Sequence, residues 1–280
     1  MAKIPGCAGC KNADANAFEI PFTMAFQPFV DLSKGRIWGY EALVRGKNGE
    51  SASEVLGQVN DTNRYAFDQA CRVKSIELAG EKLESKDAKL SINFLPNAVY
   101  EPRACIRATL AAAAKAKFSP RRLMFEFTEN EEMADTGHVM HIVSEYKKMG
   151  FTTAIDDFGA GFSGLGLLAR FQTDVIKLDM ELVRDIDSSS SRQAIVSGIM
   201  SMAKLMKLQV LAEGVETEAE THCLLGLGVY LLQGYFFAKP QVEDFVQEKD
   251  IKAIADGFPV PSQTQSDTVA FYQWREGRVA

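Results

Sequence analysis

The chain has 280 residues, of which 46% are hydrophobic and 24% are charged, and its formal net charge is −6. This composition excludes a disordered chain and argues against a surface that coats DNA, while a small phosphorylated ligand stays open. No stretch approaches the roughly 18 apolar residues of a membrane span, and residues 1–5 lead into no hydrophobic signal-peptide core. We therefore expect a cytoplasmic protein without a membrane span.

Apolar runs and helical periodicity alternate along most of the chain. The first two predicted strands, residues 22–30 and 36–43, are joined by so short a turn that only an antiparallel pair fits. The later predicted strands are residues 90–94, 123–127, 152–155, 175–178, 209–212 and 230–235. The predicted helices are residues 52–60, 63–84, a segment through 111–114, 131–149, 163–170, 191–207, 217–227 and 241–254. This order predicts an α/β fold: a modified TIM (β/α)8 barrel with one antiparallel strand from the N-terminal hairpin.

Three regions follow from the same pattern. Residues 1–20 are polar and irregular and are expected to form a flexible N-terminal leader, residues 21–256 one domain, and residues 257–280 a C-terminal tail. Cys7 and Cys10 have the spacing of half a zinc or redox site, but no second pair completes it, so a mildly reactive leader is favoured. Five cysteines without a framework fit a reducing compartment, and three histidines argue against zinc or His-based catalysis.

Polar residues end or interrupt the apolar strands at one end of the predicted barrel. Asp156 and Asp157 close the fifth strand and lead into a glycine-rich loop, an arrangement suited to a divalent-metal site close to a ligand. Because the carboxyl ends of barrel strands converge on one face, we expect the polar residues of the other strands to join this site. They are Glu41, Asn93, Glu126, Lys177, Asp179, Glu213 and Gln233.

Two interpretations of these residues compete. Taken singly, each acid is more simply a strand-end residue facing solvent, and Asp156 with Asp157 is also ordinary turn chemistry. Several acids in register favour a shared site, because an isolated buried carboxylate is costly unless it is paired or metal-bound. A set of carboxylates with one amide and almost no histidine suits Mg²⁺ or Mn²⁺. Two such ions sharing a carboxylate are the usual means of hydrolysing a phosphodiester in line.

A series of motifs lies in a fixed order along the chain. They are Gln27-Pro28, Glu41-Ala42-Leu43-Val44-Arg45, Asn93, Glu126-Phe127-Thr128-Glu129, Asp156-Asp157-Phe158-Gly159, Asp174-Val175-Ile176-Lys177-Leu178-Asp179, Ala212-Glu213-Gly214-Val215-Glu216 and Gln233-Gly234-Tyr235. The chain resembles the EAL-domain phosphodiesterases, which hydrolyse cyclic di-GMP to the linear dinucleotide pGpG. The resemblance covers about residues 20–245. The tripeptide alone is a weak signal, whereas the ordered set is very specific.

The resemblance implies a role for each matching position. The implied ligands of one metal are Glu41, Asn93, Glu126 and Asp156. The implied ligands of a second metal are Asp156, which bridges, Asp157 and Glu213. Lys177 is implied to orient and help activate the attacking water, and Glu213 to act as general base, although two metals make a separate base less necessary. The implied contacts of the dinucleotide are Gln27, Leu43, Arg45, Asp179, Glu216 and Gln233, with Arg45 gripping phosphate.

The loop after Asp157 departs from the pattern typical of the resembled family, Asp-Asp-Phe-Gly-Thr-Gly-Tyr-Ser-Ser. Here Ala160, Phe162 and Gly164 replace Thr, Tyr and Ser. Hydroxyls that could bind the loop are lost, at about 0.5–1.5 kcal/mol each if they were used, so we expect a looser loop. Glu129 matches an acid that anchors this loop. The family uses the loop to respond to dimer contacts, so the change bears on regulation more than on chemistry.

Three functions follow from the resemblance. An active cyclic di-GMP phosphodiesterase is favoured because every ligand position is filled. A catalytically silent receptor that signals through a protein partner would usually lack a metal ligand, and Arg45 and Gln233 argue against a scaffold that has abandoned the nucleotide. The implied cofactors are two Mg²⁺ or Mn²⁺ ions, with Ca²⁺ inhibitory, and the implied assembly is a homodimer near residues 163–170. The protein is expected either to act alone or to take its input from a separate sensor or regulatory partner.

Overall fold

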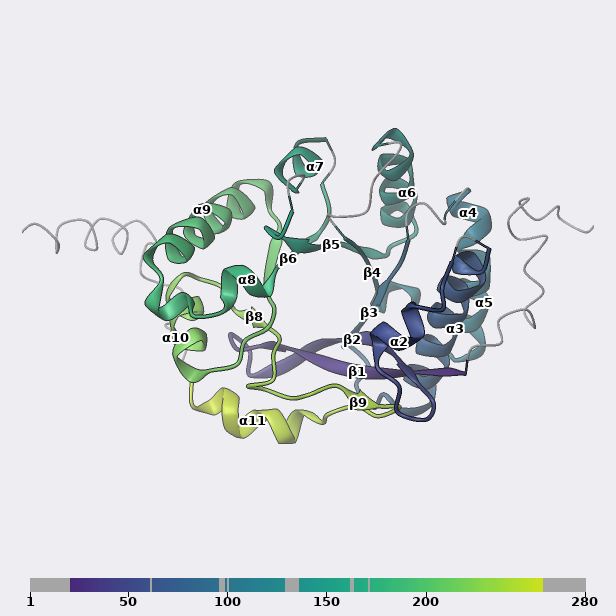
Figure 1. The fold of residues 1–280 in the computed structure, drawn as a ribbon, viewed down its shortest axis with the longest axis horizontal. Helices are drawn as coiled ribbons and strands as arrows, with labels where there is room; N and C mark the ends of the chain where they lie inside the picture. The colour runs from purple at the N-terminus through teal and green to yellow at the C-terminus, as the bar shows by residue number, and fades with distance from the viewer. Residues whose placement is uncertain are drawn as a thin grey trace, which may run out of the picture.

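The computed structural model describes residues 21–60, 62–95, 99, 101–128, 136–161, 164–170 and 172–258. A ring of strands lies at the centre, with helices around it (Figure 1). The strands are β1 (Phe22–Asp31), β2 (Arg36–Gly46), β3 (Lys89–Asn93), β4 (Leu123–Thr128), β5 (Thr152–Phe158), β6 (Val175–Leu178), β7 (Gln209–Ala212), β8 (Leu231–Leu232) and β9 (Gln241–Val242). The predicted leader, and the tail beyond residue 258, lie outside the described residues.

The strands β1 to β8 close into a barrel. From β2 to β8 each strand pairs with the next in chain order, and all these pairs are parallel. β1 lies between β8 and β2 and is antiparallel to both, and β9 pairs with β1 as an additional strand. The predicted barrel with one antiparallel strand from the N-terminal hairpin is confirmed.

Helices surround the ring in Figure 1. They are α2 (Ala52–Leu56), α3 (Arg64–Lys82), α4 (Pro102–Cys105), α5 (Arg107–Lys115), α6 (Thr136–Lys148), α7 (Gly164–Arg170), α8 (Met180–Val183), α9 (Ser190–Met206), α10 (Glu218–Gly226) and α11 (Glu248–Asp256), with 3-10 turns η2 (Pro120–Arg122) and η3 (Ile186–Ser188). The prediction of a helix over residues 241–254 is wrong at its start. There, β9 precedes α11, which begins where the Asp250 carboxylate accepts the Gln247 N–H at 3.2 Å.

An apolar layer fills part of the barrel interior. Side chains two residues apart on a strand face the same side, so each member of this layer lies beside a polar residue of the predicted site. Met124 precedes Glu126 by two positions on β4, and Phe29 follows Gln27 by two on the antiparallel β1. The layer therefore packs inside the barrel directly next to the level of the polar residues. Its members are Phe29, Met124, Ala154, Val175, Leu211 and Leu231, with exposed fractions of 0–6%.

A buried ion pair on α3 holds the chain where β3 ends. The carboxylate of Asp68 pairs with the guanidinium of Arg72, and both side chains are buried. The second oxygen of Asp68 accepts the backbone N–H of Leu95 at 3.3 Å. Leu95 follows Asn93 by two residues, so this contact fixes the backbone that carries the predicted metal ligand of β3.

Candidate active site

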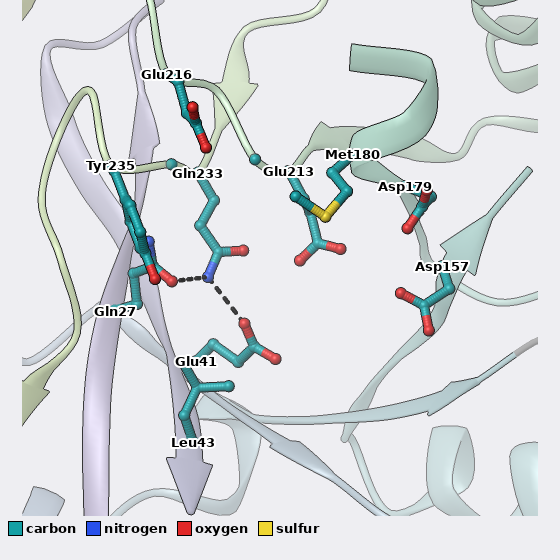
Figure 2. A pocket seen from close by; sticks show the side chains of 12 residues that line it. Gln27, Glu41, Leu43, Asp157, Asp179, Met180, Glu213, Glu216, Gln233 and Tyr235 are labelled. Atoms are coloured by element: carbon teal, nitrogen blue, oxygen red, sulfur yellow. Dashed lines mark hydrogen bonds between the residues drawn. The ribbon is translucent and has the colours of Figure 1, made fainter. Parts of the chain in front are cut away.

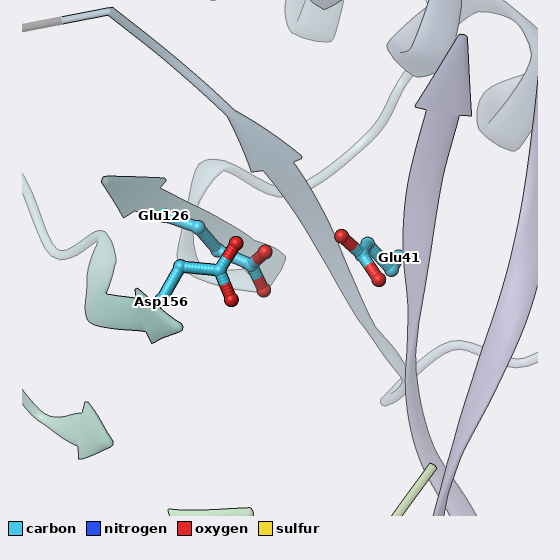
Figure 3. A group of neighbouring side chains, drawn as sticks. All are labelled: Glu41, Glu126 and Asp156. Atoms are coloured by element: carbon cyan, nitrogen blue, oxygen red, sulfur yellow. The ribbon is translucent and has the colours of Figure 1, made fainter. Parts of the chain in front are cut away.

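Three of the predicted acids come from nearby strands of the barrel, and their side chains point toward one another (Figure 3). Glu41 comes from β2, Glu126 from β4 and Asp156 from β5. On β2, Glu41 is the cross-strand partner of Gln27 on β1, so the hairpin delivers two predicted site residues at one level. All four of these side chains are buried. The strands therefore bring the polar positions together, as the sequence predicts.

Lys177 lies at the centre of these acids. Its Nζ is 2.7 Å from Glu126 Oε2 and 2.7 Å from Glu213 Oε1. The same atom is 2.8 Å from Asp156 Oδ1 and 3.6 Å from Glu41 Oε1. One buried ammonium thus offsets only part of the negative charge of four carboxylates.

The carboxylates form two groups that share one member. Oxygen atoms of Glu41, Glu126 and Asp156 lie within 4.8 Å of one another, and so do oxygen atoms of Asp156, Asp157 and Glu213. Asp156 Oδ1 is buried and accepts no hydrogen bond within the described ranges, although Lys177 Nζ is near it. Such hard oxygen donors suit divalent cations.

Asn93 is the one amide of the predicted ligand set. It ends β3 and its side chain is exposed toward the site. Its Nδ2 donates a hydrogen bond to Glu41 Oε1 at 3.0 Å. The structure therefore places Asn93 with the first group of carboxylates.

Burial and mutual repulsion disfavour the charged forms of these acids. Burial is the main cause that raises the pKa of Glu126 to about 8; Lys177 opposes the rise, and Glu41 and Asp156 add to it. Burial and the neighbouring Asp156 raise the pKa of Asp157 to about 6. A divalent cation at these oxygens would relieve both effects, so the residues present fit a metal.

A cavity of about 270 Å³ opens beside the acids (Figure 2). Among the residues predicted to contact a dinucleotide, those that line it are Gln27, Leu43, Asp179, Glu216 and Gln233. Its other lining residues are Glu41, Asp157, Met180, Glu213, Gly214, Gly234 and Tyr235. Gln233 Nε2 donates to Glu41 Oε2 at 2.8 Å and to Gln27 Oε1 at 3.2 Å, which ties the cavity wall to the acids.

One predicted contact residue lies away from the cavity lining. Arg45 does not line the cavity, and its Nη1 donates to the carbonyl of Val44 at 2.6 Å. It lies two residues beyond Leu43 on β2, and so on the same face of that strand. Glu129, the predicted loop anchor, and Phe162 lie outside the described residues.

The sequence matches a known protein family and several of its members. A family model described as the EAL domain matches residues 16–240. The chain belongs to the EAL domain family. It is 35% identical over 219 residues to the blue light- and temperature-regulated antirepressor BluF of Escherichia coli. This alignment covers 78% of this chain and 54% of BluF. The chain is 30% identical over 228 residues to the probable cyclic di-GMP phosphodiesterase PdeA of Escherichia coli. This alignment covers 75% of this chain and 31% of PdeA. The chain thus spans about half of one relative and a third of the other.

Solved EAL structures have the same fold. A standalone versatile EAL protein from Vibrio cholerae, in a c-di-GMP-bound form, aligns with a TM-score of 0.79 and 52% identity over 82% of this chain and 97% of that chain. BlrP1 from Klebsiella pneumoniae, in a manganese and cyclic di-GMP complex, aligns with a TM-score of 0.75 and 36% identity over 80% of this chain and 57% of that chain. Within the described part of this EAL chain, no helix combines the length and apolar character that a membrane crossing requires.

Some residues of this EAL site were not predicted from the sequence. Met180 and Tyr235 line the cavity, with exposed fractions of 42% and 57% (Figure 2). Ser91 is fully buried on β3, and its hydroxyl donates to Glu126 Oε1. The signal for Ser91 was its position two residues before Asn93, which puts both side chains on one face of the strand.

Replacing Ser91 by alanine is expected to lower the free energy of unfolding by about 1–3 kcal/mol, because it leaves a fully buried oxygen of Glu126 without its hydrogen-bond donor. Ser75→Ala is the matched control: this serine is also fully buried, but its hydroxyl donates to the neutral carbonyl of Cys71 at 2.7 Å. Its loss should cost only about 0.5–1.5 kcal/mol. Urea unfolding of both variants measures the difference. Equal losses would show that Ser91 contributes nothing particular to Glu126.

Proposed function

We propose that this EAL chain is a metal-dependent phosphodiesterase that hydrolyses cyclic di-GMP to linear pGpG. The observation that carries the proposal is the pair of carboxylate groups sharing Asp156, beside a cavity of about 270 Å³. The name of PdeA and the cyclic di-GMP complexes of the Vibrio cholerae protein and BlrP1 support the choice of substrate.

Two divalent cations would be held by this acidic site. The residues proposed for the first are Glu41, Asn93, Glu126 and Asp156, and those for the second are Asp156, Asp157 and Glu213. When bound, Mg²⁺ or Mn²⁺ would polarise the scissile phosphate and favour in-line attack of water. Ca²⁺ is proposed to occupy the same site without supporting turnover, because its longer bonds and looser geometry fit the reacting atoms less well.

Lys177 is proposed to orient the attacking water, and Glu213 to accept its proton. Burial opposes the charge on Lys177, but its four acidic neighbours outweigh that effect and raise its pKa well above the usual value. Lys177 therefore stays protonated and acts as a donor that orients water, rather than as a base. Burial raises the pKa of Glu213 well above its usual value, and the neighbouring Lys177 opposes the rise. Bound cations would keep its carboxylate ionised, so that it could accept a proton from the attacking water.

The dinucleotide is proposed to occupy the cavity. Gln27, Leu43, Asp179, Glu216 and Gln233 line it and offer both apolar and polar contacts. Arg45 would reach the cavity edge from the end of β2 by giving up its bond to the Val44 carbonyl. Its planar fork can then bind a phosphate through two parallel hydrogen bonds.

Replacing Arg45 by methionine should raise KM for cyclic di-GMP by about tenfold or more, since a charge-assisted hydrogen bond contributes about 1.5–3 kcal/mol. The value of kcat should change less, because the acids and Lys177 are untouched. Arg36→Met is the matched control, since Arg36 is exposed at the opposite end of the same strand. Steady-state kinetics of both variants give the comparison. Equal KM values for the two variants would show that Arg45 does not contact the substrate.

A second candidate is a cyclic di-GMP receptor that signals through a protein partner. It is favoured by the 35% identity to BluF, which is named an antirepressor, and by Ala160 in the loop after β5. Homodimerisation near α7, a separate regulatory partner and a cytoplasmic location stay predictions. The identities of the relatives support an enzyme and a receptor alike, so an assay must separate them.

The test is incubation of the purified protein with cyclic di-GMP and either Mg²⁺ or Mn²⁺, with products separated by chromatography. Binding is measured in parallel in Ca²⁺, where turnover is not expected. Metal-dependent pGpG that disappears in Glu41→Ala would support the phosphodiesterase. Tight binding without turnover would favour the receptor. If the protein neither binds nor hydrolyses cyclic di-GMP, both proposals are wrong.

A further inference from the structure

We infer that Glu220 is a positioning residue that holds two loops of the pocket rim against each other. The α8 segment comprises residues 179–185, and the β7–α10 loop comprises residues 213–217. They lie far apart in the sequence, yet both line the one cavity. The α8 segment contributes Asp179 and Met180, and the β7–α10 loop contributes Glu213, Gly214 and Glu216.

The Glu220 carboxylate accepts hydrogen bonds from both loops. It belongs to the first turn of α10, and the residue is only 3% exposed. Oε1 accepts the Asp185 N–H at 2.9 Å. Oε2 accepts the Glu216 N–H at 2.8 Å and the Thr217 N–H at 3.0 Å. Each oxygen therefore serves one loop, and bonds to a buried charged acceptor are stronger than neutral ones.

The bond to Asp185 fixes an unusual backbone conformation. Asp185 has φ 53°, in the left-handed region that residues other than glycine rarely adopt. Such a conformation persists only where the surroundings determine it. Its N–H bond to Glu220, immediately before η3, is a contact that does so.

Two more contacts join the loops. Gly214 has φ 70°, and a Cβ built on it would lie 2.6 Å from Met180 Cβ, so the backbone of one loop touches the other. Arg184 Nη2 lies 2.8 Å from Glu216 Oε1, an ion pair across the rim. Glu220 is the buried member of this set, and Arg184 is its half-exposed counterpart.

The consequence for binding rests on the proposed function. If Asp179 and Glu216 contact the dinucleotide, the bridge sets how far apart these two contacts lie. The chemical step should depend on it less, because the Glu213 N–H donates to the Leu178 carbonyl at 3.2 Å and keeps its own anchor. Loss of the bridge should therefore raise KM more than it lowers kcat.

Glu220→Gln is the variant that breaks the bridge selectively. An amide has one acceptor oxygen, which can still serve the Glu216 and Thr217 N–H groups at the start of α10. Its NH₂ group then faces the Asp185 N–H, donor against donor. Glu218→Gln is the matched control, because it makes the same change in the same turn on a side chain that is 72% exposed.

Hydrogen exchange tests the bridge without any ligand. In Glu220→Gln the amides of residues 180–188 should exchange about tenfold faster than in wild type, and in Glu218→Gln they should not change. In the enzyme assay, KM for cyclic di-GMP and its Kd in Ca²⁺ should rise about three- to tenfold in Glu220→Gln alone. Glu220→Gln behaving like Glu218→Gln in both measurements would overturn the inference.

The two proposals fail in different ways. If wild type neither binds nor hydrolyses cyclic di-GMP, the proposed function fails, while the exchange comparison still decides the bridge. If Glu220→Gln does not fold, the amide of Asp185 in the wild-type protein decides, because its N–H donates to the buried Glu220 carboxylate and should exchange slowly. Exchange as fast as that of an exposed amide would overturn the inference.

Discussion

Replacing Asp156 by asparagine is expected to lower kcat by about 10³-fold. Asp156 is the residue that both carboxylate groups share. A metal ion supplies several kcal/mol of transition-state stabilisation, and each 1.36 kcal/mol is a factor of ten in rate. An amide in place of this carboxylate removes one negative charge from both proposed metal positions at once.

The measurement pairs turnover with metal binding. The Asp156→Asn protein should form little pGpG with Mn²⁺, and calorimetry should show weaker Mn²⁺ binding than in wild type. Glu41→Ala should behave similarly, because it removes a ligand of the first group. Glu218→Gln is the control for loss of an acid outside the site. Near-normal turnover by Asp156→Asn would refute the two-metal proposal.

Replacing Lys177 by methionine is expected to reduce both turnover and stability. The variant keeps an unbranched side chain one atom shorter than lysine but leaves Glu126, Asp156 and Glu213 without the ammonium now 2.7–2.8 Å from each. Removing one partner of a buried charge group costs about 3–5 kcal/mol of unfolding free energy. Loss of the donor that orients water should lower kcat by about 10²-fold or more.

Urea unfolding with and without Mn²⁺ measures the stability effect. The variant should be less stable than wild type without metal and should regain part of the difference when Mn²⁺ is added, because the ion binds the folded acids. Lys115→Met is the control, since Lys115 and its ion-pair partner Glu77 are both exposed and such a pair contributes at most about 1 kcal/mol. Equal stability of Lys177→Met and wild type would contradict this account of the site.

The sequence predicted the barrel and its acids because both depend on strand pattern. An apolar run ending in a polar residue marks the carboxyl end of a barrel strand, so Glu126, Lys177 and Glu213 could be assigned to one face. On each of these strands the apolar residue two positions before the polar one lies on the same face, so it also points into the barrel interior. Neither inference needs side-chain contacts, and both agree with the structure.

Other parts of the site depend on contacts between distant segments. The capping pattern of Thr217 and Glu220 is visible in the sequence, but nothing in it reveals that Asp185 shares the Glu220 carboxylate. Met180 and Tyr235 are ordinary apolar and aromatic residues until the fold exposes them in one cavity. The last predicted strand was too long, because only Leu231 and Leu232 pair before the chain turns toward β9.

The apolar layer inside the barrel has a kinetic consequence. Because Phe29, Met124 and Leu231, with their three neighbours in the layer, are packed and almost fully shielded, the described residues leave no open path through the barrel beneath the acids. If the chain has the proposed activity, cyclic di-GMP and pGpG must then use the same opening of the cavity. Bound pGpG would exclude cyclic di-GMP, so pGpG should inhibit hydrolysis competitively.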